Sequence, residues 1–293
     1  MSTSSTSINR LRAYYYLTKP GIVHGNTIAA AAGYLFGAGS SFSFITFFAL
    51  VIGIGAVISS ACVYNNILDR DIDAVMKRTQ QRALVSGVIS PLRAFIFATL
   101  LLGLGITVLL LGANLTAMLF ALGGHIAYAL LYTYAKRVTV HGTLIGTISG
   151  STPPVIGYVA ATGQADMTAL VLYLIMVTWQ MPHFYAIALF RRDDYASAKV
   201  PVLSVVKGEQ ATRREIVFYV SLFIVFSALL GFTGASLFTT LVLILSGAYW
   251  LYLCLLPPES RGGIIAWSRH QFGWSLTVLL VFCSVISLDQ FFH

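Results

Sequence analysis

The amino-acid sequence predicts an all-α polytopic membrane protein, and two features of its composition support this fold class. Hydrophobic residues make up 57% of the 293-residue chain and charged residues only 10%, whereas charged residues are about 25% of an ordinary soluble domain. The mean hydropathy is +0.82. A chain this apolar along its whole length has too little polar surface to solvate a globule. We therefore expect one transmembrane domain over residues 1–293.

A third observation is the number of apolar segments. A helix needs about 20 mostly apolar residues to cross the hydrocarbon core, and nine segments meet this requirement: residues 21–39, 44–64, 94–112, 115–135, 140–161, 167–190, 215–234, 237–256 and 272–292. A short Val-His-Gly echo opens the first and fifth segments, at residues 23–25 and 140–142. We therefore expect two related four-helix halves plus one helix, because internal repeats often meet at a site in membrane proteins.

The 18 basic residues fall on one side of this predicted topology. Three precede the first segment, five follow the second, two follow the fourth, six follow the sixth and two follow the eighth, while the alternate connections contain none. Lys and Arg mark loops that stay in the cytoplasm, so the N-terminal segment 1–19 is predicted to be cytoplasmic. No contiguous soluble basic domain exists, so the net charge of +8 reflects topology and not nucleic-acid binding.

Two long cytoplasmic loops, residues 65–93 and 191–214, carry most of the acidic residues. Seven of the ten lie in these loops or at their ends: Asp69, Asp71, Asp73, Asp193, Asp194, Glu209 and Glu215. The loops are four segments apart, so both face the same side of the membrane and can converge. Carboxylates gathered beside Arg and Lys at a membrane face indicate an active site.

Helical spacing sharpens this prediction for the first loop. If the second segment continues past the membrane, Asn65, Asp69 and Asp73 share one helix face, and Asn66 is spaced to join it. Stacked carboxylates repel each other unless a cation lies between them. Two or three oxygen ligands with retained waters suit Mg²⁺, whose shell substrate phosphates commonly complete.

Arg78 and Arg82 are also four residues apart and supply planar forks for phosphate oxygens. The alternative interpretation is a solvated helix end whose charges pair with one another. A second acidic-basic loop on the same face makes that alternative weaker.

The motif Asn65-Asn66-x-x-Asp69-x-x-x-Asp73 resembles the first aspartate-rich motif of the UbiA-type intramembrane prenyltransferases, whose usual form is Asn-Asp-x-x-Asp-x-x-x-Asp. Longer strings resemble the protoheme IX farnesyltransferase branch of that family. They are Leu-Thr-Lys-Pro-Gly-Ile at 17–22, Trp-Gln-Met-Pro-His-Phe at 179–184, Asp-Asp-Tyr at 193–195 and Pro-Val-Leu at 201–203. The resemblance covers nearly the whole chain.

The resemblance implies an enzyme that transfers the farnesyl group of farnesyl diphosphate to a vinyl group of heme B, releasing diphosphate and giving heme O for terminal oxidase assembly. It implies a Mg²⁺ cofactor held by Asp69, Asp73 and Asp193, with Asn65 and Asn66 as neutral ligands or orienters. Residues implied to bind diphosphate are Lys19, Arg78, Arg82, Asp193, Asp194 and Lys199. The implied partners are both substrates, the lipid bilayer and heme-handling or oxidase-assembly proteins, with the active site facing the cytoplasm of a bacterial inner membrane.

Two departures from the wider family leave the number of metal ions open. Asn66 replaces the usual aspartate, which matches the heme-farnesylating branch. In the second loop Ser197 and Ala198 stand four residues after Asp193 and Asp194, where carboxylates would be expected.

His183 is the one ionisable residue within the sixth segment, next to Pro182. Eleven residues of helix place it about 16 Å below Asp194, and an ionisable residue at such depth indicates function. The resemblance implies a role at the heme, as iron ligand or in orienting the vinyl group. The alternative is a core histidine that is hydrogen-bonded to a neighbouring helix.

Other functions remain open at this point. An enzyme of the same family that prenylates an aromatic acid for quinone synthesis would share most of these features. A secondary transporter also places charged loops near helix breaks, but here the carboxylates cluster at the cytoplasmic rim. Sequence alone does not divide the arginines between diphosphate and heme propionates.

Overall fold

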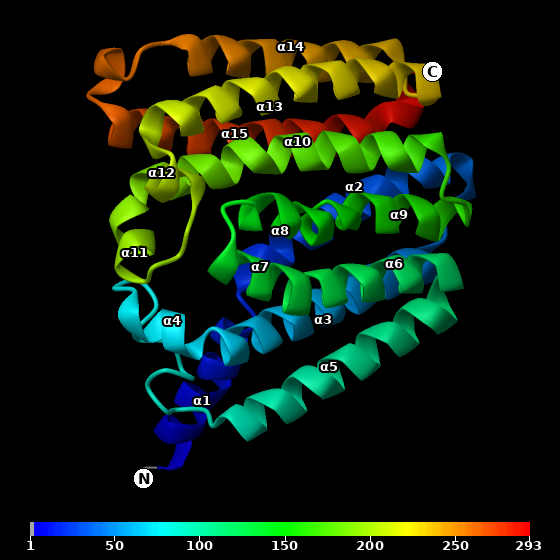
Figure 1. Cartoon of the computed structure of the whole chain (residues 1–293). Helices are drawn as coiled ribbons and strands as arrows, with labels where there is room; N and C mark the ends of the chain where they lie inside the picture. Colours follow the sequence, from blue (N-terminus) through cyan, green and yellow to red (C-terminus); the bar gives the residue numbers. More distant parts are fainter. Residues whose placement is uncertain (1–2) are drawn as a thin grey trace.

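The computed structural model describes residues 3–293, and this part of the chain is helical and contains no β-strand (Figure 1). The α-helices are α1 Thr3–Leu17, α2 Pro20–Ala38, α3 Phe44–Leu68, α4 Arg70–Val75, α5 Pro91–Gly112, α6 Leu115–Ile126, α7 Thr133–Val138, α8 Gly142–Gly150, α9 Thr152–Thr162, α10 Met167–Phe190, α11 Arg192–Ser197, α12 Leu203–Val206, α13 Gly208–Leu230, α14 Leu237–Leu255 and α15 Ile264–Leu288. A π-helical segment, Ala127–Tyr132, joins α6 to α7. The all-α prediction is confirmed.

Seven helical segments of the described chain are long and apolar enough to cross a membrane: Phe44–Leu68, Pro91–Gly112, Leu115–Val138, Met167–Phe190, Gly208–Thr233, Leu237–Leu255 and Ile264–Phe291. The multi-pass prediction is confirmed. Two of the nine predicted segments are absent from this set: residues 21–39, which correspond to α2, and residues 140–161, which α8 and α9 divide between them. The count of nine crossings and the cytoplasmic N-terminus stay predictions.

The break between α8 and α9 at Ser151 has a local cause. Thr152 is followed by Pro153 and Pro154, and a proline has no N–H to donate to the carbonyl four residues earlier. A proline also disfavours helical geometry in the residue before it. The chain therefore starts a new helix with its prolines in the first turn, where no intrahelical donor is needed.

Helices α2 and α9 pack closely at the centre of the bundle. A Cβ atom added to Gly157 would lie 1.9 Å from the backbone oxygen of Ala30, and one added to Gly33 would lie 2.0 Å from that of Pro154. Only glycine allows the two backbones to approach this far, as at other membrane helix interfaces. Other residues of the same two helices, Ala29 of α2 and Ile156 of α9, line the cavity described below.

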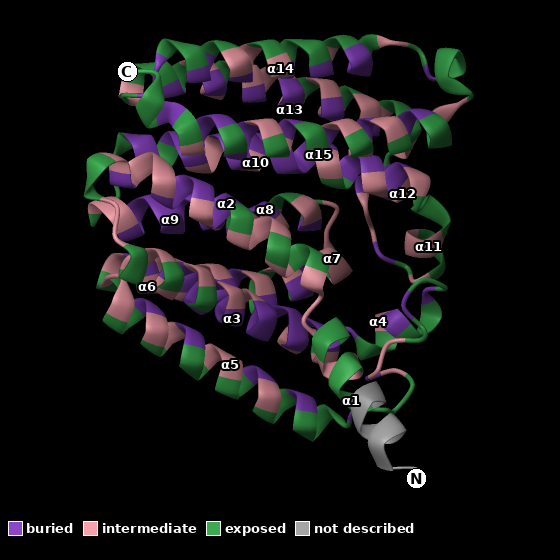
Figure 2. Ribbon diagram, turned by 180° about the vertical axis from the view of Figure 1, so that it is seen from behind, coloured by how far each residue is buried: buried purple, intermediate pink, exposed green. Residues whose placement is uncertain are grey.

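The remaining helices flank this central pair. Helices α3, α5 and α6 lie on one side of it and α10, α13 and α14 on the other (Figure 1). Helix α15 packs against α2, α10 and α14, so the last helix is part of the bundle and closes it. In the apolar stretch of α10, 61% of the residues are buried, whereas in that of α5 only 22% are buried. Figure 2 shows the same gradient from a buried centre to exposed outer faces. The site described below lies in this buried centre.

Candidate active site

A cavity of about 550 Å³ lies between α2, α3, α6, α8, α9, α10 and α15. Its lining is apolar over most of its depth, with residues such as Ile54, Ile156 and Leu279. At one end it meets α4, α7 and α11, and there the lining becomes charged. The cavity thus joins a polar end to an apolar chamber.

The Asn-Asn-x-x-Asp-x-x-x-Asp motif forms part of this polar end. Helix α3 continues to Leu68, so both asparagines lie on its last turn, and Asp69 separates α3 from α4. The backbone bonds continue across the junction, because Asp69 N–H donates to Asn65 O at 2.9 Å and Asp73 N–H to Asp69 O at 2.8 Å. Both aspartates are buried and line the cavity.

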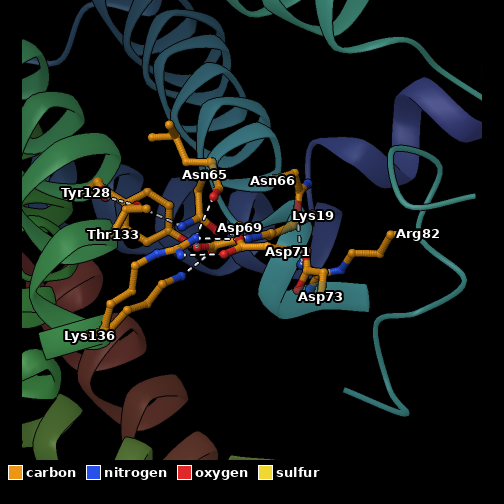
Figure 3. Close-up of polar contacts among 12 residues, drawn as sticks. Lys19, Asn65, Asn66, Asp69, Asp71, Asp73, Arg82, Tyr128, Thr133 and Lys136 are labelled. Carbon is orange, nitrogen blue, oxygen red and sulfur yellow. Dashed lines mark hydrogen bonds and ion pairs between the residues drawn. The ribbon is translucent and has the colours of Figure 1, made fainter. Parts of the chain in front are cut away.

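Each of the two carboxylates is paired with its own basic side chain in the structure (Figure 3). Lys136 from α7 pairs with Asp69, and Arg137 lies 3.5 Å from the other oxygen of that carboxylate. Arg82 Nη1 lies 2.6 Å from Asp73 Oδ2 and also donates to Asn66 Oδ1 at 2.9 Å. These basic side chains thereby offset the repulsion between the Asp69 and Asp73 carboxylates that the spacing of the motif predicts.

The two asparagines tie the motif to neighbouring elements. Lys19 Nζ donates to Asn65 Oδ1 at 2.5 Å, and Asn65 Nδ2 donates to Thr133 Oγ1 at 2.9 Å. Asn66 Nδ2 donates to Leu17 O at 2.7 Å. Burial lowers the pKa of Lys19 from 10.5 to about 8, since desolvation disfavours the charged form.

The charge balance of the polar end suits an anion. Among the residues lining the cavity, Lys19, Arg78, Arg82 and Lys136 are basic, whereas Asp69 and Asp73 are acidic. With all six groups charged, four positive and two negative charges leave a net charge of +2. A diphosphate carries the complementary charge, and in a buried site the attraction is stronger than in water.

The same residues fit a divalent cation only if a ligand completes its shell. Asp69 Oδ1 is buried and has no hydrogen-bond partner. No cluster of three or more His, Cys, Asp or Glu side chains that could hold a metal occurs in the described part of the chain. Two carboxylates, amide oxygens and the oxygens of a bound phosphate are a donor set that Mg²⁺ accepts.

The second loop contributes less to the cavity than its sequence predicts. Asp193 and Lys199 are exposed, Asp194 lies 3.9 Å from Arg191, and none of Asp193, Asp194 and Lys199 is among the described residues that line the cavity. Tyr195 does line it, on α11. The roles of the three charged residues stay predictions.

His183 lies deeper in the cavity, on α10. Its Nδ1 is 2.8 Å from Ser275 Oγ of α15, and that hydroxyl donates its one proton to Phe272 O. His183 Nδ1 therefore carries the proton in this pair, which leaves the lone pair on Nε2. The ring stacks on Trp179. His183 thus bonds to a neighbouring helix, as the alternative interpretation expects, and it also lines the cavity. Its role at the heme stays a prediction.

The depth expected for His183 is wrong in detail. Helix α10 ends at Phe190, seven residues or about 10 Å after it. The chain then turns into α11, so no continuous helix carries the histidine 16 Å below Asp194.

Sequence reasoning did not find three residues of the polar end. Lys136, Tyr128 and Tyr132 all line the cavity, and the two tyrosine rings stack at 5.4 Å. The Lys136 ammonium also lies 5.1 Å from the Tyr132 ring centre. The sequence contains one indication of Lys136, the Lys-Arg pair that follows the fourth predicted segment. That pair was interpreted only as evidence for the orientation of the chain in the membrane.

The fold and this site define an intramembrane prenyltransferase, and the chain belongs to the UbiA prenyltransferase family, whose model matches residues 26–276. It is similar to a protein named protoheme IX farnesyltransferase 1 from Shewanella frigidimarina, with 42% identity covering 99% of this chain and 95% of the relative. It is also 41% identical to the protoheme IX farnesyltransferase of Yersinia enterocolitica, over 95% of each chain.

Solved structures support the same fold. A structure described as digeranylgeranylglyceryl phosphate synthase superposes with a TM-score of 0.78 at 17% identity, covering 96% of this chain and 99% of that one. A UbiA homologue from Archaeoglobus fulgidus, bound to GPP and Mg²⁺, gives a TM-score of 0.71 at 15% identity, covering 92% and 99%. At this identity the likeness concerns the fold alone.

Proposed function

We propose that the protein transfers the farnesyl group of farnesyl diphosphate to a vinyl group of heme B, releasing diphosphate and giving heme O. The observation that carries the proposal is one cavity of about 550 Å³ in which a buried polar end of net positive charge continues into an apolar chamber. Such a cavity suits a substrate with a charged head and a long hydrocarbon tail. Names of relatives about 40% identical over almost the full length supply the acceptor, heme B.

In this proposal the polar end holds the diphosphate. Asp69, Asp73 and the two asparagines would hold Mg²⁺, which supplies charge stabilisation for the departing diphosphate when bound. Arg82 and Lys136 pair with the two carboxylates in the structure. Once the carboxylates bind a cation, both basic side chains are free to turn to phosphate oxygens, and preorganised donors of this kind stabilise a leaving anion.

The allylic group then reacts in the apolar part of the chamber. The bond between carbon 1 and the diphosphate oxygen breaks, and the stacked faces of Tyr128 and Tyr132 lie where they can stabilise the cation. The vinyl group supplies the electron pair for the new carbon–carbon bond. Water adds to the resulting cation on the heme side chain and loses a proton, giving the hydroxyethylfarnesyl group. The apolar lining keeps other water away.

His183 would hold the heme in this proposal. Its Nδ1 proton is donated to Ser275, so Nε2 is available as an iron ligand. The aromatic rings of Trp179 and Phe272 lie 5.1 and 4.9 Å from the imidazole and offer faces for a flat macrocycle. The basic loops support an active site that faces the cytoplasm of a bacterial inner membrane. The heme O formed there would serve terminal oxidase assembly.

An acceptor competition tests the function. Membranes that contain the protein receive farnesyl diphosphate and Mg²⁺ with equal amounts of heme B and an aromatic acid that serves as quinone precursor, and the products are separated by chromatography. We expect heme O alone, and none from membranes with Asp69→Ala. A prenylated aromatic acid in place of heme O would instead favour the quinone-type alternative.

A further inference from the structure

A second cavity lies beside the first and is open on its outer side. It has a volume of about 520 Å³ and lies between α6, α8, α9 and α10, with Leu119, Val155, Leu170 and Tyr173 in its lining. Two residues, Gly124 and Thr152, line both cavities. The two spaces are therefore neighbours, and these residues stand between them.

The contact between Gly124 and Thr152 is tight. A Cβ atom added to Gly124 would lie 2.8 Å from Thr152 Oγ1 and 3.8 Å from its Cβ. The Thr152 hydroxyl donates to Ser149 O at 2.7 Å, which fixes the side chain. The wall at this point consists of one threonine side chain against a bare backbone.

Two helical walls lead from the polar end to this contact. Segments α6–α7 and α8–α9 run antiparallel, because Gly142 faces Lys136, Gly146 faces Tyr132 and Thr152 faces Gly124. Thr133, which bonds to Asn65 of the diphosphate site, is nine residues from Gly124, at most about 13 Å of helix, since the π-helical segment Ala127–Tyr132 between them rises less per residue than an α-helix. On the opposite wall, Gly142 to Thr152 spans ten residues or about 15 Å.

A farnesyl chain has about the same length. Its main chain has 11 carbon–carbon bonds, and an extended chain of such bonds advances about 3.5 Å per three bonds, or about 13 Å in all. A chain with its head at the diphosphate site and its tail along these helices would end near the Gly124–Thr152 contact. One more isoprene unit adds about 5 Å and would need the space beyond it.

We propose that Gly124 and Thr152 form the wall that sets the accepted prenyl length, and that the second cavity becomes a subsite for a fourth isoprene unit when the wall is thinned. This inference rests on the proposed function. An added or removed methylene in an apolar pocket changes discrimination about 10- to 200-fold.

The test measures binding without heme, so it is independent of the acceptor. Purified protein with Mg²⁺ is titrated with the unreactive thiolodiphosphates of farnesol and geranylgeraniol, and ligand-dependent thermal stabilisation gives the two affinities. The wild type should favour the farnesyl analogue at least tenfold. Thr152→Ala should reduce this ratio about tenfold, by improving geranylgeranyl binding. Thr152→Gly, which removes the same side-chain atoms, should change the ratio in the same direction if the alanine variant is unstable.

Two further variants separate the wall from other effects. Thr152→Val keeps the side-chain shape and should keep the wild-type ratio to within about threefold, since only the hydroxyl is lost. The pair Gly124→Ala/Thr152→Ala places two methyl carbons 3.8 Å apart, which closes the wall again and should restore the farnesyl preference. A wild-type ratio in Thr152→Ala and Thr152→Gly, or no restoration in the double variant, would overturn the proposal.

Discussion

Removing the charge of Asp69 tests the metal site with little change in shape. The Asp69 side chain is 5% exposed and one of its oxygens has no hydrogen-bond partner. In Asp69→Asn the positive groups that attract diphosphate all remain, so substrate binding should persist. Metal stabilisation of a leaving oxygen contributes several kcal/mol, and losing about 3–5 kcal/mol slows turnover roughly 10²- to 10⁴-fold.

The assay is the rate of heme O formation at saturating farnesyl diphosphate, with analogue binding measured in parallel. Glu259→Gln is the matched control, because it also removes one carboxylate charge, at an exposed residue of the connection between α14 and α15 that does not line the cavity. A surface substitution of this kind changes stability by about 0.5 kcal/mol or less, so the control should stay within a few-fold of wild type. Equal rates for Asp69→Asn and wild type would refute the assignment of Asp69 to the metal.

Three further predictions concern other parts of the chain. His183→Ala should abolish heme O formation while farnesyl analogue affinity persists; parallel loss of both would indicate a structural role. Burial lowers the pKa of Lys19 to about 8. The affinity for the farnesyl analogue should therefore fall as the pH rises through 8, because this ammonium loses its charge. In Lys19→Met the affinity should not show this fall. Gly157→Ala should lower the free energy of unfolding by about 1–3 kcal/mol, because the added Cβ would lie 1.9 Å from Ala30 O. The control Gly103→Ala, whose Cβ meets open space, should not be destabilised in this way. Equal stability of the two variants in thermal unfolding would contradict the α2–α9 packing.

The sequence was most informative where local geometry decides the outcome. Asn65, Asp69 and Asp73 are linked by helical backbone bonds even though α3 ends at Leu68, so the i, i+4 spacing correctly placed both carboxylates at one cavity. The family followed from the same motif. These features depend on residues near one another in the chain.

Features that depend on distant segments could not be predicted. Lys136 reaches Asp69 across 67 residues, and no local pattern marks that pairing. The second loop was expected to converge with the first on one site, but the chain turns at Arg191 into α11 and leaves Asp193 exposed. The division of residues 140–161 at Ser151 was readable from Pro153 and Pro154, yet the apolar composition favoured one continuous span.

Farnesyl transfer to heme B is tested most directly by the mass of the product formed in ¹⁸O-labelled water. Purified protein receives heme B, farnesyl diphosphate and Mg²⁺, and the heme fraction is analysed by mass spectrometry. The account predicts heme B heavier by one farnesyl group and one ¹⁸O-labelled hydroxyl, with one diphosphate released per heme. Unmodified heme B in the presence of folded protein that binds the farnesyl analogue would contradict it.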